Sequence, residues 1–207
     1  KTFLINEQDL LFTRDTVNQV DVITYPTKSR YVNQLQFVIE NNRVLYPYKG
    51  ALQVEQGKGF ARVSFTGNYF FNYAKGGGMD VRLFAGKFFY LGDKTFINQF
   101  ETGRYHLNMT GPKGEEDYTY SNYFIGRNEF EKFSSQQIMI RDGGFKVRTD
   151  YLSNKIGKTD DWLAAANFTS TIPKALFPFK LPLRVFVDIG TYAEAWKKNA
   201  PTARFVY

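Results

Sequence analysis

Between Gly59 and Leu91 the chain alternates between apolar and polar side chains over two consecutive stretches. A period of two residues is typical of a β-strand with two chemically different faces. The first stretch exceeds the five or six residues of an average strand and matches the roughly nine to eleven that a tilted strand needs to cross a bilayer. Its apolar face carries Ala61, Val63, Phe65, Gly67, Tyr69, Phe71 and Tyr73, and its polar face carries Arg62, Ser64, Thr66, Asn68 and Asn72.

A run of three glycines, residues 76–78, separates the two stretches. Glycine accepts the positive φ angles of tight turns, so this run predicts a β-hairpin. The second strand places Met79, Val81, Leu83 and Ala85 opposite Asp80, Arg82 and Gly86. The alternation then becomes irregular, because three aromatic residues fall on the otherwise polar side. Either a β-bulge near Gly86 or an aromatic girdle at a membrane boundary would account for Phe84, Phe88 and Tyr90.

Weaker alternation predicts further strands on both sides of this hairpin, for about eight strands and no helix. Pro47 lies inside one of these runs and indicates a sheet edge or a bulge there. Gly143 and Gly144 indicate a kink in another run. Gly57 and Gly59 predict a hairpin turn, since no third glycine or helix follows as in a phosphate-binding loop. The additional runs cover residues 1–29, with a break at Pro26, and residues 31–40, 44–55, 138–149, 162–172 and 183–190.

Composition narrows the class of protein. The 207 residues include 18% aromatic side chains, which suits interfacial belts of Tyr and Phe. Mean hydropathy is −0.39, and no stretch approaches the roughly twenty apolar residues of a transmembrane helix, which excludes a helical membrane protein. No cysteine is available for a disulfide or a thiolate metal site. The net charge of +7 comes from scattered basic residues, which disfavours nucleic-acid binding and leaves lipid headgroups and lipopolysaccharide as acidic partners.

Few residues carry candidate chemistry. His106 is the only histidine, so the chain cannot supply an HExxH zinc site, and no serine lies in a nucleophile-elbow setting. We therefore interpret His106 as a loop residue. Glu115, Glu116 and Asp117 lack the spacing of a calcium loop and are interpreted as solvated. They belong to a polar stretch, about residues 92–125, whose length is typical of an extracellular loop of a barrel.

Charged residues within the alternating strands are more informative. Five of them lie opposite the apolar face, where a barrel would turn them into its lumen: Arg62, Asp80, Arg82, Arg184 and Asp188. Pairing across strands predicts a structural lumen network, and a selectivity or substrate-guiding role is the alternative. The residues predicted to face lipid are Val63, Phe65, Tyr69, Phe71, Tyr73, Val81, Leu83, Val185 and Val187.

Three strings carry a resemblance to a known family: GKGFARVSFTGNYFFNYAKGGGMDVRLFAGKFFYLGDK (57–94), HLNMTGPKGEEDYTYSNYFIGRNEF (106–130) and LRVFVDIGTYAEAW (183–196). They resemble the carboxy-terminal, barrel-forming part of large bacterial gluzincin, or membrane alanyl aminopeptidase-like, metallopeptidases. The resemblance implies a zinc peptidase-like domain that precedes a membrane-embedded sheet. No catalytic or metal-binding residue carries over, because this chain has no HExxH.

Together these observations predict an all-β fold, an antiparallel transmembrane β-barrel segment covering residues 1–207, as a piece of a longer chain. The expected function is to anchor a larger envelope protein, metallopeptidase-like by the resemblance, in a bacterial outer membrane. Its expected partners are outer-membrane lipid, lipopolysaccharide and other envelope proteins, without nucleic acid. We expect no cofactor in this chain, with zinc confined to the part outside it. The alternatives are a soluble ligand-binding β-barrel, with the apolar face inward, and a pore or transport barrel.

Overall fold

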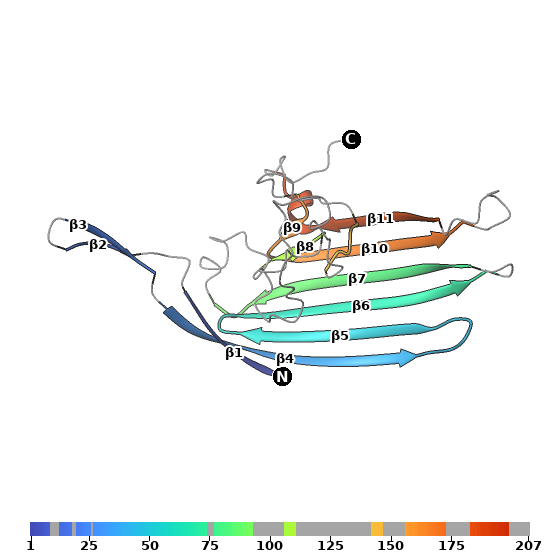
Figure 1. The fold of residues 1–207 in the computed structure, drawn as a ribbon, viewed down its shortest axis with the longest axis horizontal. Helices are drawn as coiled ribbons and strands as arrows, with labels where there is room; N and C mark the ends of the chain where they lie inside the picture. Colours follow the sequence, from blue (N-terminus) through green and yellow to red (C-terminus); the bar gives the residue numbers. More distant parts are fainter. Residues whose placement is uncertain are drawn as a thin grey trace.

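The computed structural model describes residues 1–8, 13–17, 20–25, 27–73, 77–92, 106–110, 142–146, 156–172 and 183–198. Within these residues the fold is all-β, with one 3-10 turn, η4 (Ala193–Trp196), as its helical element (Figure 1). No helix in this part of the chain is long and apolar enough to span a membrane. The strands are β1 (Thr2–Gln8), β2 (Thr13–Val17), β3 (Val20–Thr24), β4 (Thr27–Asn41), β5 (Tyr48–Gly57), β6 (Phe60–Asn72), β7 (Gly78–Tyr90), β8 (Leu107–Asn108), β9 (Lys158–Thr159), β10 (Trp162–Thr171) and β11 (Arg184–Tyr192).

One large sheet of seven strands has the order β1-β4-β5-β6-β7-β10-β11, and all its strand pairs are antiparallel. The β2–β3 hairpin projects beyond one end of this sheet, and the short β8–β9 pair lies near β10 (Figure 1). Over the described residues the sheet is open, with β1 and β11 at its edges. The all-β, largely antiparallel class is thus confirmed, whereas closure into a barrel is not seen.

The β6–β7 pairing corrects the interpretation of the irregular aromatic residues. Its register runs without interruption from Phe60 opposite Tyr90 to Asn72 opposite Gly78, so no bulge occurs near Gly86. Phe84 and Phe88 are also buried. The interpretation of these two residues as part of an exposed aromatic girdle is therefore wrong. Alternation along β7 places them on the polar side of the sheet, and they are buried there because part of the chain covers that side.

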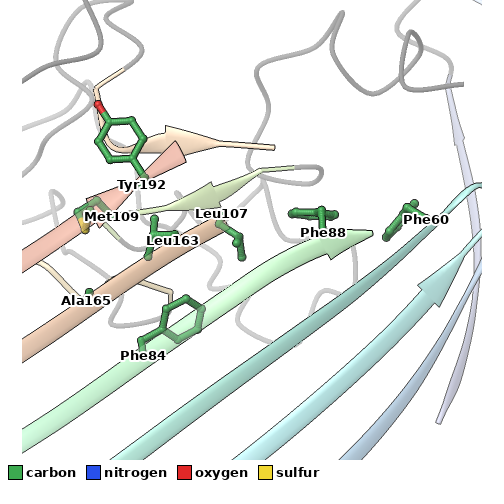
Figure 2. Packing of buried hydrophobic residues seen from close by; sticks show 8 residues of the cluster. All are labelled: Phe60, Phe84, Phe88, Leu107, Met109, Leu163, Ala165 and Tyr192. Atoms are coloured by element: carbon green, nitrogen blue, oxygen red, sulfur yellow. The ribbon is translucent and has the colours of Figure 1, made fainter. Parts of the chain in front are cut away.

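The covering part is the segment between β7 and β10. Leu107 and Met109 of this segment pack onto the sheet and form an apolar cluster with residues of β6, β7, β10 and β11 (Figure 2). Glycines in the strands make room for it: a Cβ on Gly86 would lie 3.1 Å from Leu107, and one on Gly190 would lie 2.5 Å from the sulfur of Met109. The buried members of the cluster are Phe60, Phe84, Phe88, Leu107, Met109, Leu163, Ala165 and Tyr192.

Three further expectations change. Pro47 lies outside the strands, because β4 ends at Asn41 and β5 begins at Tyr48. Residues 142–146 do not form a sheet strand; Phe145 instead makes an isolated parallel bridge with Thr110, so pairing is not antiparallel throughout. Eleven strands are described where about eight were predicted.

The predicted loop at 92–125 lies largely outside the described residues. Among its described residues, 106–110 are buried, and Leu107 and Asn108 pair with Thr159 and Lys158. The expected runs at 138–140 and 147–149 lie outside the described residues as well.

Antiparallel partners share a face, so the register assigns every side chain of the large sheet to one of two faces. The polar face carries the covering segment. The opposite face, called the apolar face below, carries large apolar side chains that are exposed on strands from β4 to β11: Leu35, Phe37, Ile39, Tyr48, Leu52, Phe65, Tyr69, Phe71, Leu83, Phe89, Val185, Val187 and Ile189. The exposure of so many large apolar side chains on one face is unusual for a sheet in a soluble protein, whose apolar side is normally buried.

Candidate functional site

Six side chains form a continuous polar row across the polar face, one from each strand between β4 and β11. Each member is the direct register partner of the next. The row combines acceptors and donors and runs perpendicular to the strands. In order from β4 to β11 its members are Glu40, Lys49, Asn68, Arg82, Asn167 and Asp188.

The β7–β11 half of the polar row holds the segment 142–146. Arg82 donates from Nη2 to the Asp142 carbonyl at 2.8 Å, and Asn167 donates from Nδ2 to the Gly143 carbonyl at 3.1 Å. Asp188 accepts from the Lys146 backbone N–H and from its Nζ, both at 2.9 Å. These contacts are mostly to main-chain atoms. The half-row therefore binds the main chain of a kinked segment, in which Gly144 has a φ of +67°.

Contacts within the row and to the second side of segment 142–146 fix this arrangement. Asn167 accepts from Arg82 at 3.0 Å and donates to Asp188 at 3.0 Å. On its far side the segment bonds to residues 108–109, where the Gly143 N–H donates to the Asn108 carbonyl at 2.9 Å. Segment 142–146 is thus held between the sheet and residues 108–110.

Gly143 and Gly144 allow segment 142–146 to lie close against Met109 and Arg82. A Cβ on Gly143 would lie 2.5 Å from the Met109 backbone, and one on Gly144 would lie 2.5 Å from Arg82. Gly144 also has a φ of +67°, which other residues rarely adopt. The kink expected at these residues is a close docking of backbone onto the polar row.

A second polar group, nearer the β5–β6 turn, is centred on Glu55. This carboxylate is fully buried and accepts from Arg62 Nε at 2.6 Å. Its other oxygen accepts from Gln34 and Gln53. Arg62 also lies over the Phe88 ring, 5.7 Å from its centroid. The charge of Glu55 is therefore neutralised by an adjacent guanidinium and three hydrogen bonds, as a buried charge requires.

Beyond the docked segment the polar face contains a groove of about 590 Å³. Its walls carry two exposed ion pairs, Lys49–Glu40 at 3.2 Å and Arg184–Asp80 at 3.9 Å. Gly144 and Lys146 of the docked segment line one end. The β4–β6 half of the polar row lines the groove and is not covered by segment 142–146.

The five charged residues singled out in the sequence all lie on the polar face, in three separate groups. Arg62 pairs with Glu55, and Asp80 pairs with Arg184. Arg82 and Asp188 are joined through Asn167. The sequence indicated the face of each residue but not its partner.

The nine residues predicted to face lipid share the apolar face of the sheet, with Tyr73 just beyond the end of β6. Phe65, Tyr69, Phe71, Leu83, Val185 and Val187 are exposed, and Val63, Val81 and Tyr73 are half-buried. The hydroxyl of Tyr73 lies 2.7 Å from that of Ser170. His106, interpreted as a loop residue, is buried beside β8, while 115–117 lie outside the described residues.

Sequence reasoning missed Glu55, Asn167 and Lys146. Glu55 and Asn167 had a readable signal, because each is a polar residue opposite the apolar positions of an alternating strand. Lys146 had none, since its role depends on the docking of a segment remote in sequence.

No group of three or more His, Cys, Asp or Glu side chains that would hold a metal ion occurs among the residues described. These residues do not fit a zinc centre. No protein-family model, curated protein or solved structure matches the chain.

Proposed function

We propose that this chain is a membrane-embedded β-sheet that anchors a larger envelope protein in a bacterial outer membrane. The observation that carries the proposal is the broad apolar face, exposed from β4 to β11. Contiguous apolar surface of this extent marks an interaction with lipid or another apolar partner. Phe65 at its centre is 45% exposed.

The dimensions and the charge distribution favour lipid as that partner. β6 and β7 have 13 residues each and β10 has 10, enough for tilted strands to cross a hydrocarbon layer. The polar row and the Glu55–Arg62 pair lie on the opposite face. A transmembrane barrel separates its residues in this way, with apolar side chains outward and polar ones inward.

The chemistry of the described residues and the family resemblance support an anchoring role. The described residues contain structural ion pairs and hydrogen bonds, and we assign none of them to catalysis. The resemblance to the barrel-forming region of gluzincin-type metallopeptidases supports an envelope protein with a zinc-peptidase-like part outside this chain. Partners of the anchor would be outer-membrane lipid, lipopolysaccharide and neighbouring envelope proteins.

The sharpest test uses adjacent positions on opposite faces of β6. The chain has no cysteine, so Phe65→Cys and Ser64→Cys each create a single labelling site. Both variants are labelled with an environment-sensitive fluorophore and reconstituted into vesicles that contain nitroxide-labelled lipid. We expect strong quenching at position 65 and weak quenching at position 64. Equal quenching at the two positions would contradict a lipid-facing apolar face.

Two complementary measurements address the alternatives. The wild-type chain should float with vesicles and migrate differently on gels with and without heating, as closed outer-membrane barrels do. If the chain were instead recovered without detergent as a monomer that binds an apolar ligand, the soluble ligand-binding barrel would be favoured over the membrane anchor. Steady conductance in a planar bilayer would indicate a pore.

A further inference from the structure

Segment 142–146 shows how the polar row recognises polypeptide. Arg82 and Asn167 bind two successive carbonyls, and Asp188 binds a backbone N–H three residues later. Neighbouring strands are about 4.8 Å apart and an extended chain rises about 3.3 Å per residue, so crossing from β7 to β11 takes three to four residues. Segment 142–146 crosses these strands with a kinked main chain instead, because Gly144 has a φ of +67°.

The row continues past the docked segment with the same kinds of group. Asn68 provides an amide, Lys49 a cationic donor and Glu40 a carboxylate acceptor, as Asn167, Arg82 and Asp188 do in the other half. These three residues span two strand spacings and line the groove, whose volume of about 590 Å³ is in the usual range for a ligand site. The groove begins at Gly144 and Lys146, where the docked segment ends.

We propose that the β4–β6 half of the polar row binds a second short peptide through its main chain, beside segment 142–146. Backbone carbonyls of this peptide accept from Asn68 and Lys49, and a backbone N–H donates to Glu40. The inference does not depend on what covers the apolar face, and its test is independent of membrane insertion.

Charge favours a peptide of low net charge over an anion. The two ion pairs in the groove, Lys49–Glu40 and Arg184–Asp80, each bring together one positive and one negative side chain. Lys146 is neutralised by Asp188 at 2.9 Å. Arg82 donates to two neutral oxygens of the docked segment and of Asn167. Among the described residues that line the groove, each of these cations is already held by an ion pair or hydrogen bonds, so they do not form the cluster of uncommitted positive charge that a phosphate or sulfate group would need.

The test uses a fluorescein-labelled peptide with the sequence of residues 142–146, which has no net side-chain charge and is already bound by the other half-row. The full chain, in detergent micelles if it requires them, is titrated with this peptide and fluorescence anisotropy is measured. Saturable binding is expected, and Asn68→Ala and Lys49→Ala should each weaken it about fivefold, the effect of one lost hydrogen bond. Gln36→Ala, an exposed residue on the same face outside the groove, should leave it unchanged.

Two results of this titration would overturn the proposal. One is the absence of saturable binding at millimolar peptide by wild-type chain whose fold is intact by circular dichroism. The other is equal binding by the wild type and both groove variants, which would place the peptide elsewhere. Restoration of binding in Asn68→Gln, which keeps the amide, would support main-chain recognition. Displacement of the labelled peptide by a neutral oligosaccharide such as maltohexaose at the same concentration would identify a sugar as the preferred occupant of the groove. This result would contradict the proposal that the groove binds a peptide.

Discussion

Arg82 and Asn167 lie directly opposite each other on β7 and β10, and Arg82 Nη1 donates to Asn167 Oδ1 at 3.0 Å. Both residues also bind segment 142–146, through the carbonyls of Asp142 and Gly143. One cross-strand pair thus joins the sheet to the segment that covers its polar face.

The buried side chain of Asn167 makes three hydrogen bonds, one to the Gly143 carbonyl and two to Arg82 and Asp188, which themselves bind segment 142–146. Asn167→Ala should therefore lower the free energy of unfolding by about 3 kcal/mol, because it leaves buried partners unsatisfied. Hydrogen exchange at 142–146 should accelerate in the variant. Asn72→Ala, a half-buried position on the same face near the end of β6, is the control and should cost less than about 0.5 kcal/mol. Equal effects of the two substitutions would argue against the fastening role of Asn167.

Gly144 is required for two separable reasons, its φ of +67° and its contact with Arg82. Gly59 has a φ of +87°, but a Cβ at this position would meet nothing within 4 Å. A substitution at Gly59 therefore measures the cost of the positive φ without a steric contact. Gly59→Ala should cost about 1–2 kcal/mol from backbone strain alone. Gly144→Ala should cost at least about 1 kcal/mol more, because the methyl group displaces Arg82 or the segment. Chemical denaturation of the two variants measures this difference, and its absence would show that the contact relaxes freely.

Glu55 and Arg62 form a buried ion pair whose partners depend on each other. Glu55→Leu should destabilise the chain by about 3–5 kcal/mol, because it leaves a guanidinium buried without its carboxylate. The double variant Glu55→Leu with Arg62→Leu should be more stable than this single variant. A double-mutant cycle of unfolding free energies tests the coupling. Additive losses from the two sites would be inconsistent with a direct charge pair.

Phe65 reports on the medium that covers the apolar face. Phe65→Arg should cost roughly 2–4 kcal/mol in vesicles if the side chain lies near the middle of a bilayer. In water a 45% exposed side chain would tolerate the change at far lower cost. Gln36→Arg, exposed on the polar face, is the matched control and should be nearly neutral. Equal stabilities of Phe65→Arg and the wild type in vesicles would contradict the membrane anchor.

Local pattern was enough to predict the strands and the two chemical faces. Alternation with a period of two residues depends only on neighbours in sequence, so the strands around Phe65 and Leu83 and the turn at Lys58 and Gly59 could be predicted. The same property assigned Arg82 and Asp188 to a face opposite Phe65. A turn between two alternating stretches also predicted the β6–β7 hairpin, which the register confirms.

Tertiary structure decided which residues meet and what covers the polar face. The row from Glu40 to Asp188 depends on the register of six strands, and the Phe84 and Phe88 cluster depends on a segment inserted between β7 and β10. These contacts join residues far apart in sequence, such as Arg82 and Asp142, whose side-chain and backbone atoms are complementary only after folding. Alternation shows that Phe84 interrupts a polar face, but only Leu107 and Met109, from the segment between β7 and β10, supply the apolar surroundings that make its burial favourable.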